Sequence, residues 1–450
     1  MSQIQNPLDP EFGKGGVVTL PFPDIVGSSP TALLEMQDEK LIVILGTTES
    51  QNSPSKMVRL NTDGSLDQTF GDKGVVELST PGVWFSPRFL HLGDDDKFLT
   101  FGTAISGSEQ VELAIVRQLK NGDMDKSFGT DGLKLIDVVS LIGASASAQL
   151  MIRRHNDKRA DSFAELGGGF NYFVQEDGRI LLCCTVLFGF DDLAGVVIRL
   201  NSDGSPDLSF NGLGFVQIEL PGIERLWNYA LAVVAQGDGS VVVSGDFVRH
   251  DSNEAPEAYI ICYHQNGQIN PQFGNNNNGL VVITRTGYWL SLASMRLMPS
   301  VNSDKGIIAI GSAGDDGMVV VLTSKGAFNL VFNNGKTLYT RLLEQGEKWL
   351  RAGIQTDSGG NSTKIILAGR GSGDFVDEKT SILTARFQFS GVLDTTFGEN
   401  GFNEFINPQG INRFLDGAVL GNNNIVASGS VRVATPPVQG YVLRYLGEPL

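Results

Sequence analysis

Residues 61–74 read NTDGSLDQTFGDKG, and closely similar strings recur along the chain. Residues 121–132 read NGDMDKSFGTDG, residues 201–212 read NSDGSPDLSFNG and residues 390–401 read SGVLDTTFGENG. The shared pattern is Gly-x-x-Asp/Asn-x-x-Phe, in which only the N-terminal copy lacks the Gly and has Asn6 instead. Its aromatic position falls at Phe12, Phe70, Phe128, Phe210, Phe273, Phe332 and Phe397. Successive Phe residues are 58, 58, 82, 63, 59 and 65 residues apart. A nearly constant period of this length indicates a repeat architecture.

Each period contains four short apolar runs in a fixed order. A run such as VVEL at 75–78 follows the loop, a second run ends in a turn, a third closes on Gly as in KFLTFG at 97–102, and a fourth leads into the next loop. Short runs rich in Val, Ile and Leu between turn residues are typical of a four-stranded antiparallel sheet. Several such sheets bury both of their faces when they pack around an axis as a β-propeller.

The two ends of the chain each carry half of a repeat. NPLDPEFGKGGVVTLP at 6–21 begins inside the loop pattern, and YVLRYLGEPL at 441–450 stops inside it. We therefore predict an all-β, seven-bladed propeller with four antiparallel strands per blade, closed by an N-terminal strand that completes the C-terminal blade and removes an exposed sheet edge. The predicted domain spans residues 1–450 in repeats of about 58–65 residues, with the last blade shared by 402–450 and 6–22.

The composition is acidic, with 34 Lys and Arg against 50 Asp and Glu and a net charge of −16. This charge repels phosphate backbones and anionic lipid, so we expect neither nucleic acid nor a membrane surface as a partner. No apolar run approaches the ~18 residues needed to cross a bilayer, and no leader is recognisable, so we expect a cytoplasmic protein or one exported without a leader. Cys183, Cys184 and Cys262 have no metal-binding spacing, and no disulfide is expected.

The repeated loop resembles a known family. Its Gly-x-x-Asp-x-x-Phe-Gly units, together with the turn Asp177-Gly178-Arg179-Ile180-Leu181 before a third run, resemble the delta-sixty repeat, a bacterial β-propeller family of unknown function. The resemblance covers essentially the whole chain. It implies a propeller fold and a bacterial source, and it carries no catalytic motif.

The loop itself has two interpretations. Asn61, Asp63 and Asp67 could supply oxygens to a calcium ion. However, the copies at 323–326 (TSKG) and 389–391 (FSG) lack a carboxylate before the Gly. Gly permits a positive φ, Asp or Asn caps a turn, and a buried Phe stabilises by roughly 2–3 kcal/mol. We therefore interpret the loop as a structural corner and expect no cofactor or metal, with calcium as the weaker alternative.

The 82-residue period contains about 24 additional residues, near 139–168. This insertion places five basic side chains within seven positions, namely Arg153, Arg154, His155, Lys158 and Arg159. One interpretation is a solvated loop with incidental charges. The other is a projection that docks an acidic partner or caps one face of the ring.

Aromatic and basic residues gather at the start of the second run. The tryptophans of the chain lie there, at Trp84, Trp227, Trp289 and Trp349. Four arginines lie nearby in sequence, at Arg88, Arg225, Arg351 and Arg413. In other four-stranded propellers this run is the innermost strand, so these side chains would surround the mouth of the central channel. Such a ring suits a sugar, a peptide or an anionic small molecule, although each indole could instead fill the wedge between two blades.

The sequence contains no catalytic signature. His91, His155, His250 and His264 have neither the spacing of a metal site nor that of a nucleophilic triad. We therefore predict a non-enzymatic binding or scaffold propeller, monomeric, that takes a protein or carbohydrate partner at one channel face. The alternative is a carbohydrate-binding lectin or carbohydrate-active enzyme that uses the central channel.

Overall fold

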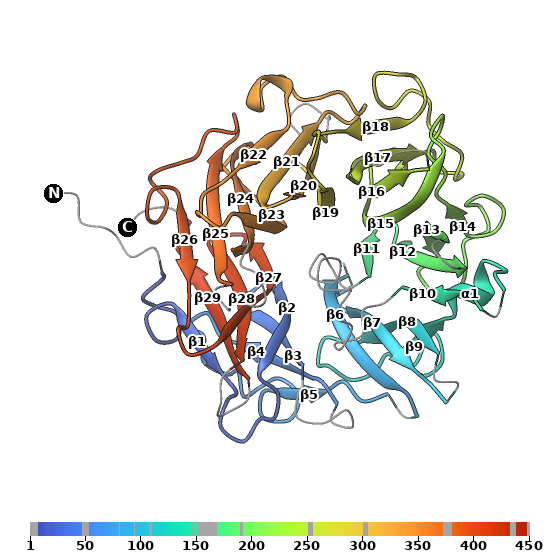
Figure 1. Ribbon diagram of the computed structural model, residues 1–450. Helices are drawn as coiled ribbons and strands as arrows, with labels where there is room; N and C mark the ends of the chain where they lie inside the picture. The colour runs from blue at the N-terminus through green and yellow to red at the C-terminus, as the bar shows by residue number, and fades with distance from the viewer. Residues whose placement is uncertain are drawn as a thin grey trace.

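The computed structural model describes residues 8–46, 54–80, 82–93, 95–107, 110–145, 147–151, 169–189, 192–250, 255–299, 305–371, 380–432 and 438–447. Within these ranges the strands form seven sheets that stand side by side in a ring (Figure 1). The fold is a seven-bladed β-propeller with four antiparallel strands per blade, as the sequence predicts. We number the blades 1 to 7 in chain order.

The first four blades contain the following strands. Blade 1 is built from β2 (Ser29–Glu35), β3 (Leu41–Gly46), β4 (Lys56–Leu60) and β5 (Val75–Glu77). Blade 2 is built from β6 (Trp84–Leu92), β7 (Phe98–Ile105), β8 (Val111–Gln118) and β9 (Leu133–Ile136). Blade 3 is built from β10 (Gln149–Leu150), β11 (Phe170–Val174), β12 (Ile180–Gly189), β13 (Asp192–Leu200) and β14 (Phe215–Gln217), preceded by helix α1 (Val138–Leu141). Blade 4 is built from β15 (Arg225–Ala235), β16 (Val241–Arg249), β17 (Glu257–Tyr263) and β18 (Leu280–Ile283).

The remaining blades follow the same order. Blade 5 is built from β19 (Leu290–Leu297), β20 (Ile307–Ala313), β21 (Asp316–Leu322) and β22 (Leu338–Thr340), with the short 3₁₀ turn η2 (Asn333–Gly335). Blade 6 is built from β23 (Glu347–Thr356), β24 (Ser362–Gly371), β25 (Ile382–Gln388) and β26 (Phe402–Phe405). Blade 7 is built from β27 (Ile411–Val419), β28 (Ile425–Arg432), β29 (Gln439–Tyr445) and β1 (Val17–Leu20).

The middle strands explain why the sequence reads as continuous apolar runs. Every residue of β17, β20 and β21 is buried, because each middle strand has a neighbouring blade on both of its faces. The core accordingly lies in the joints between blades. At the joint of blades 4 and 5, for example, Ile260 and Val242 pack in one cluster with Leu292.

The ring closes through both ends of the chain. β1 pairs antiparallel with β29, with Val17 opposite Leu443 and Leu20 opposite Gly440, so blade 7 has the strand order β1-β29-β28-β27. This confirms the predicted closure. The pairing also removes an open edge on β29.

The repeated loops are structural corners that join the third strand of each blade to the outermost one. In every corner the Asp or Asn accepts a hydrogen bond of 2.9–3.3 Å from the backbone N–H two residues later. Six of the seven corners have a Gly three residues earlier with a positive φ, as at Gly64 (φ 81°), whereas the corner at Asp9 has Asn6 at that position. The Phe three residues after the Asp or Asn is at most 2% exposed in each corner. The structural interpretation of the loop therefore holds in the described chain.

The Asp corners share a further partner that the Asn corners lack. Each corner Asp pairs with an Arg on the third strand at 2.7–2.9 Å, and that Arg lies over the corner Phe; the pairs are Asp67–Arg59, Asp125–Arg117, Asp207–Arg199, Asp394–Arg386 and Asp9–Arg444. In blades 4 and 5 the corner residues are Asn270 and Asn329, and the Arg position holds Cys262 and Val321. A buried carboxylate needs a cation, whereas an amide does not.

The insertion interrupts the innermost strand of blade 3. β10 and β11 both pair with β12, where Gln149 lies opposite Leu187 and Phe170 lies opposite Cys184. Between these two short strands lie residues 152–168, so Arg153, Arg154, His155, Lys158 and Arg159 fall outside the described residues. The earlier part of the expected insertion is not surplus, because Ala148 is buried and Leu141 and Leu150 pack against the same core cluster.

Candidate functional site at one face of the ring

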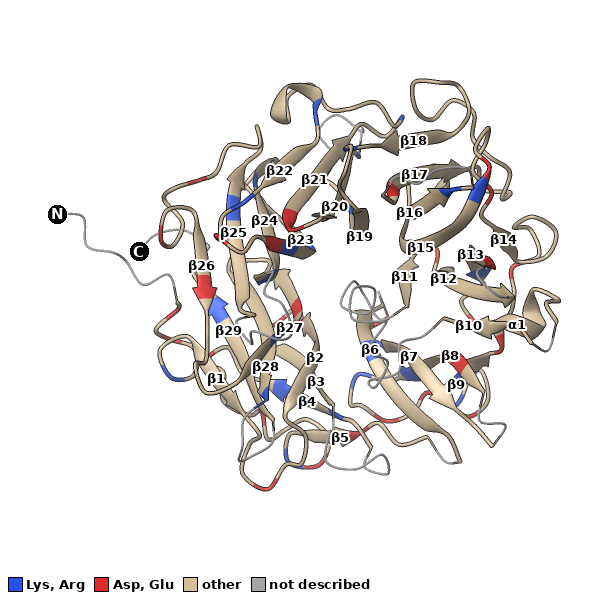
Figure 2. Ribbon diagram, in the orientation of Figure 1, with Lys and Arg blue, Asp and Glu red and all other residues tan. Residues whose placement is uncertain are grey.

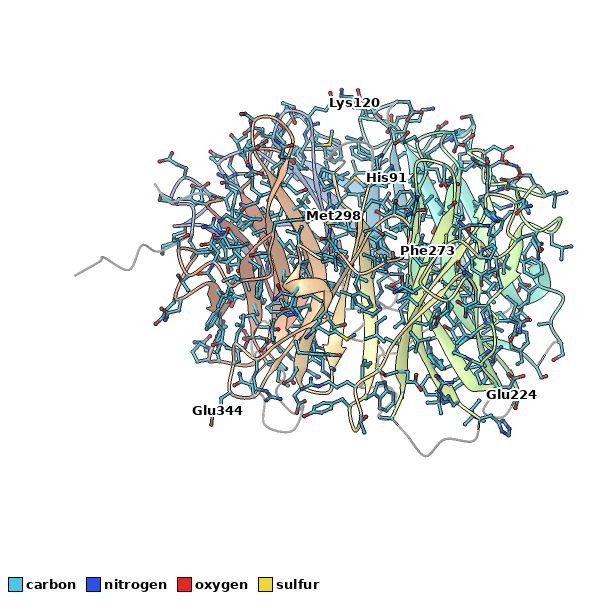
Figure 3. All side chains as sticks on the ribbon, turned by 90° about the horizontal axis from the view of Figure 1, so that it is seen from above. His91, Lys120, Glu224, Phe273, Met298 and Glu344 are labelled. Carbon is cyan, nitrogen blue, oxygen red and sulfur yellow. The ribbon has the colours of Figure 1, made fainter. Side chains whose placement is uncertain are left out.

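The propeller has two different faces (Figure 3). The corners lie at one face, marked in that view by Lys120, and the connections between blades lie at the other, marked by Glu224 and Glu344. Three tryptophans lie at or just before the start of innermost strands at this second face, which we call the Trp face. Trp84 lies opposite Ile105, Trp227 lies opposite Val248, and the Trp289 carbonyl accepts a hydrogen bond from the Gly314 N–H.

These three tryptophans occupy equivalent register positions. Each cross-strand neighbour lies three residues after a Gly of the second strand, which is Gly102, Gly245 or Gly311. Because innermost strands are arranged alike around the axis, equal register places the indoles at equal depth. Trp84 and Trp289 are 44% and 40% exposed, and Trp227 is half-buried.

Blades 4 and 5 bring two of these indoles together. The rings of Trp227 and Trp289 lie 6.5 Å apart, and Trp227 also meets Tyr229 edge-on at 5.2 Å. The residues that precede the two indoles, Leu226 and Tyr288, are exposed as well. The result is an aromatic platform at the joint between two blades.

A buried carboxylate lies next to this platform. Asp246 is directly opposite Tyr229 in the sheet and is 1% exposed. The Ser291 hydroxyl of blade 5 donates to its Oδ1 at 3.0 Å, whereas its Oδ2 has no hydrogen-bond partner in the described part of the chain. Burial raises the pKa of Asp246 to about 7, although the hydrogen bond from Ser291 opposes this shift. The carboxyl can therefore donate or accept a hydrogen bond near neutral pH.

Trp349 does not reach the Trp face. It lies opposite Gly369, three register positions deeper than the other tryptophans, and is 0% exposed. Its indole Nε1 donates to the Thr340 hydroxyl of blade 5 at 2.9 Å. This residue fills the wedge between two blades, which was the alternative interpretation of the tryptophans.

The four predicted arginines do not form one ring. Arg225 pairs with Glu219 at 2.9 Å, and Arg351 pairs with Asp416 at 2.7 Å. Arg88 and Arg413 are exposed on β6 and β27. The structure thus places these cations on different blades and at different depths.

Sequence reasoning missed Tyr229, Asp246 and Ser291. One signal was present, because the run SVVVSGDF at 240–247 carries an acid inside an apolar strand. At the equivalent position β7 and β12 have Thr103 and Thr185. An acid where other repeats have a small hydroxyl residue marks a position with a special role.

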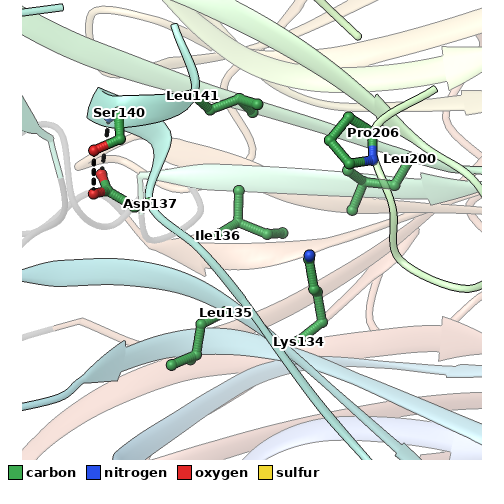
Figure 4. Close-up of a pocket in the computed structure, with 8 residues that line it drawn as sticks. All are labelled: Lys134, Leu135, Ile136, Asp137, Ser140, Leu141, Leu200 and Pro206. Atoms are coloured by element: carbon green, nitrogen blue, oxygen red, sulfur yellow. Dashed lines mark hydrogen bonds between the residues drawn. The ribbon is translucent and has the colours of Figure 1, made fainter. Parts of the chain in front are cut away.

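A shallow depression of about 310 Å³ lies on the outer rim, away from the aromatic platform (Figure 4). It is lined by residues of blade 2 and blade 3, namely Lys134, Leu135, Ile136, Asp137, Ser140, Leu141, Leu200 and Pro206. Its carboxylate is already used, since Asp137 accepts hydrogen bonds from the Ser140 backbone and hydroxyl at 3.0 and 2.6 Å.

Among the described residues no group of three or more His, Cys, Asp or Glu is placed to hold a metal ion. No helix in the same part of the chain has the length and apolar character needed to cross a membrane. The three cysteines are buried thiols without a disulfide.

Three segments of the chain match a family of β-propeller domains of unknown function, DUF5122, at residues 38–70, 175–210 and 236–273. Each segment begins at the turn between the first two strands of a blade and ends at the corner Phe. The match supports a propeller family of unknown function. No curated protein sequence matches the chain.

Several solved structures are similar in fold. A sialidase from Trypanosoma rangeli in complex with sialic acid matches with a TM-score of 0.43 and 9% identity, over 92% of this chain and 60% of the sialidase. A polysaccharide lyase, an ulvan lyase, matches with a TM-score of 0.47 and 9% identity, over 93% and 94% of the two chains. A protein of unknown function from Dyadobacter fermentans matches with a TM-score of 0.40 and 11% identity, over 97% and 100%. The present chain spans about three fifths of the sialidase's length.

Proposed function

We propose that this protein is a non-enzymatic binding propeller whose ligand site lies on the Trp face, at the joint of blades 4 and 5. The proposal rests on one observation, the aromatic pair of half-buried Trp227 and exposed Trp289 at 6.5 Å. The two indoles are held by neighbouring blades, because Trp227 lies on β15 and the Trp289 carbonyl accepts a hydrogen bond from the Gly314 N–H. A rigid aromatic surface loses little conformational freedom when it binds a ligand.

The surroundings of the pair support a binding role. Leu226 and Tyr288 extend the apolar surface on either side, and the Arg285 guanidinium lies 3.8 Å from the centre of the Tyr288 ring. Trp, Tyr and Arg are the residues that contribute most to binding energy in protein interfaces. Exposed apolar side chains clustered in this way contribute nothing to the core, which favours a partner that covers them.

Carbohydrate is the second candidate ligand, and Asp246 favours it. Sugars stack their apolar faces on indoles and use hydroxyl groups for hydrogen bonds. Asp246 is 1% exposed, so in this version it acts on the sugar through Tyr229, which lies opposite it in the sheet. This version of the proposal differs from the protein-partner version in its need for Asp246.

A glycan array and a peptide library, probed with purified protein, test both versions. We expect the variant W227A/W289A to lose at least ten-fold in affinity for any ligand found. Trp84→Ala is the matched control, because Trp84 is an exposed indole at the same register position in blade 2. Equal binding by both variants would place the site elsewhere, and loss on Asp246→Asn would favour a sugar.

The proposal also covers the family, the source, the oligomeric state and the cofactor of the protein. We propose the delta-sixty repeat as the family, a bacterial source, a monomeric state and no resident cofactor. Nucleic acid and membrane surfaces stay disfavoured by the net charge of −16.

A further inference from the structure

The innermost strands carry a net charge opposite in sign to that of the whole chain. The innermost strands of the described chain carry six basic residues, Arg88, Arg225, Arg296, Lys348, Arg351 and Arg413. They carry three acidic residues, Glu35, Glu347 and Asp416. Six minus three leaves +3 on these strands, in a protein of net charge −16. Figure 2 shows a basic residue on β6, beside the ring centre.

Five side chains from different blades face one another across the axis. We call Phe89, Tyr172, Arg296, Arg351 and Asp416 the axial cluster. Tyr172 of blade 3 interacts electrostatically with Asp416, Arg351 and Arg296, which stand on blades 7, 6 and 5. The Arg351 guanidinium also lies 5.5 Å from the centre of the Phe89 ring of blade 2. Residues of blades so far apart along the ring meet only at its centre.

The one carboxylate of the axial cluster is fully engaged. Asp416 Oδ1 pairs with Arg351 Nε at 2.7 Å. Its Oδ2 accepts a hydrogen bond of 2.9 Å from the Leu33 N–H of blade 1. Asp416 therefore ties blades 6, 7 and 1 together and balances the charge of Arg351.

Among the described residues, Arg296 has no counter-charge. Its side chain is exposed, and within the described residues its guanidinium has no ion pair. The surrounding protein nevertheless desolvates the group, which lowers the pKa of Arg296. Among the described residues the one titratable group that interacts with Arg296 is Tyr172. The Tyr172 hydroxyl donates a hydrogen bond to the Leu90 carbonyl at 2.9 Å. Burial raises the pKa of Tyr172, so this phenol stays neutral. A cation that is partly stripped of water and reachable by solvent is a candidate anion site.

We propose that the centre of the ring binds a small oxyanion, a carboxylate or phosphate group, at Arg296. The guanidinium offers a planar fork of N–H donors that matches two oxygens of such a group. This site is separate from the Trp face. Arg296 follows Trp289 by seven residues on the same extended strand, which corresponds to about 23 Å.

Thermal unfolding with inorganic phosphate and, separately, with sodium citrate tests the proposal and distinguishes the two sources of the oxyanion. Sodium chloride keeps the ionic strength constant, because screening alone changes stability. We expect at least one of the two anions to raise the Tm of the wild-type protein in a saturable way. Arg296→Gln should weaken the apparent affinity at least ten-fold.

Arg341→Gln is the matched control, since it removes the same charge from the outside of blade 5. Its partner Asp316 keeps Arg285 at 2.7 Å, so folding is preserved. The control should respond to the anion as the wild type does. An equal Tm shift in the Arg296 and Arg341 variants, or no shift with either anion in the wild type, would overturn the proposal.

Stability without the anion separates binding from a structural role. Removing a desolvated cation that has no counter-charge should leave the Tm of Arg296→Gln equal to or above the wild-type value in chloride buffer. Arg296→Lys, which keeps the charge but lacks the fork, should retain part of the anion response. If Arg296→Gln is strongly destabilised in chloride buffer, or if the lysine variant responds no better than the glutamine variant, the anion site is refuted.

Discussion

Arg444 Nε lies 2.8 Å from Asp9 Oδ2, although 435 residues separate the two in the chain. Both side chains are nearly buried, and the Arg444 guanidinium lies 4.3 Å from the centre of the Phe12 ring. The same three-residue arrangement occurs in blade 1, where Arg59 and Asp67 are eight residues apart. The corner is thus the same unit whether one continuous segment or the two ends of the chain supply it.

We predict that Arg444→Val is more destabilising than the double variant D9N/R444V. The single change leaves a buried carboxylate without a cation, which costs about 3–5 kcal/mol. The double change recreates the Asn and Val pair that blade 5 uses at Asn329 and Val321, so at least half of the loss should be recovered. Urea unfolding of both variants measures the difference. A double variant less stable than the single one would contradict this account of the Asn corners.

We predict that removal of residues 1–20 abolishes cooperative unfolding of the whole ring. The deletion takes away β1 and the nearly fully buried Phe12, Val18 and Leu20, worth about 5 kcal/mol or more together. It also exposes the edge of β29. Thermal unfolding and size-exclusion chromatography should show early melting and aggregation. A truncated protein that melts like the intact one would disprove the role of β1 in closure.

We predict that Asp246 makes stability fall as the pH rises from about 4 to about 7. The folded protein keeps the carboxyl proton up to a pKa of about 7, because burial disfavours the charge, whereas the unfolded chain loses it near 3.8. The folded state therefore binds the extra proton within this window, and its advantage is fully present below the lower value. Relative to Asp246→Asn, the wild type should lose on the order of 4 kcal/mol across the window. Parallel stability curves for the two proteins would show that Asp246 keeps an ordinary pKa.

We predict that the four tryptophans differ in their accessibility to acrylamide. Trp84 and Trp289 should be quenched readily, Trp227 less, and Trp349 hardly at all, because their exposure falls in this order. Variants with three of the four tryptophans replaced by Phe report each indole separately. Circular dichroism checks that each variant keeps its fold. Strong quenching of Trp349 would mean that the joint between blades 5 and 6 is open in solution.

The repeated sequence pattern is sufficient to predict most of the fold. Gly64, Asp67 and Phe70 act within ten residues of one another, through a positive φ, a capped turn and a buried ring. Such local preferences are readable from a sequence because they depend on neighbours in the chain. The split repeat at the two termini likewise predicted the pairing of β1 with β29.

The site depended on contacts that the sequence does not encode locally. Trp349 is buried while Trp289 is exposed, because three positions of register separate them and register is visible only in the paired strands. Arg351 finds Asp416 on another blade, whereas Arg296 finds no carboxylate in the described residues. The sequence by itself determined a closed ring of seven like sheets, since hydrophobic period and turn chemistry are local. The tertiary structure decided which polar side chains meet, because distant blades converge at the axis and at the joints, where burial gives charge and hydrogen bonding their strength.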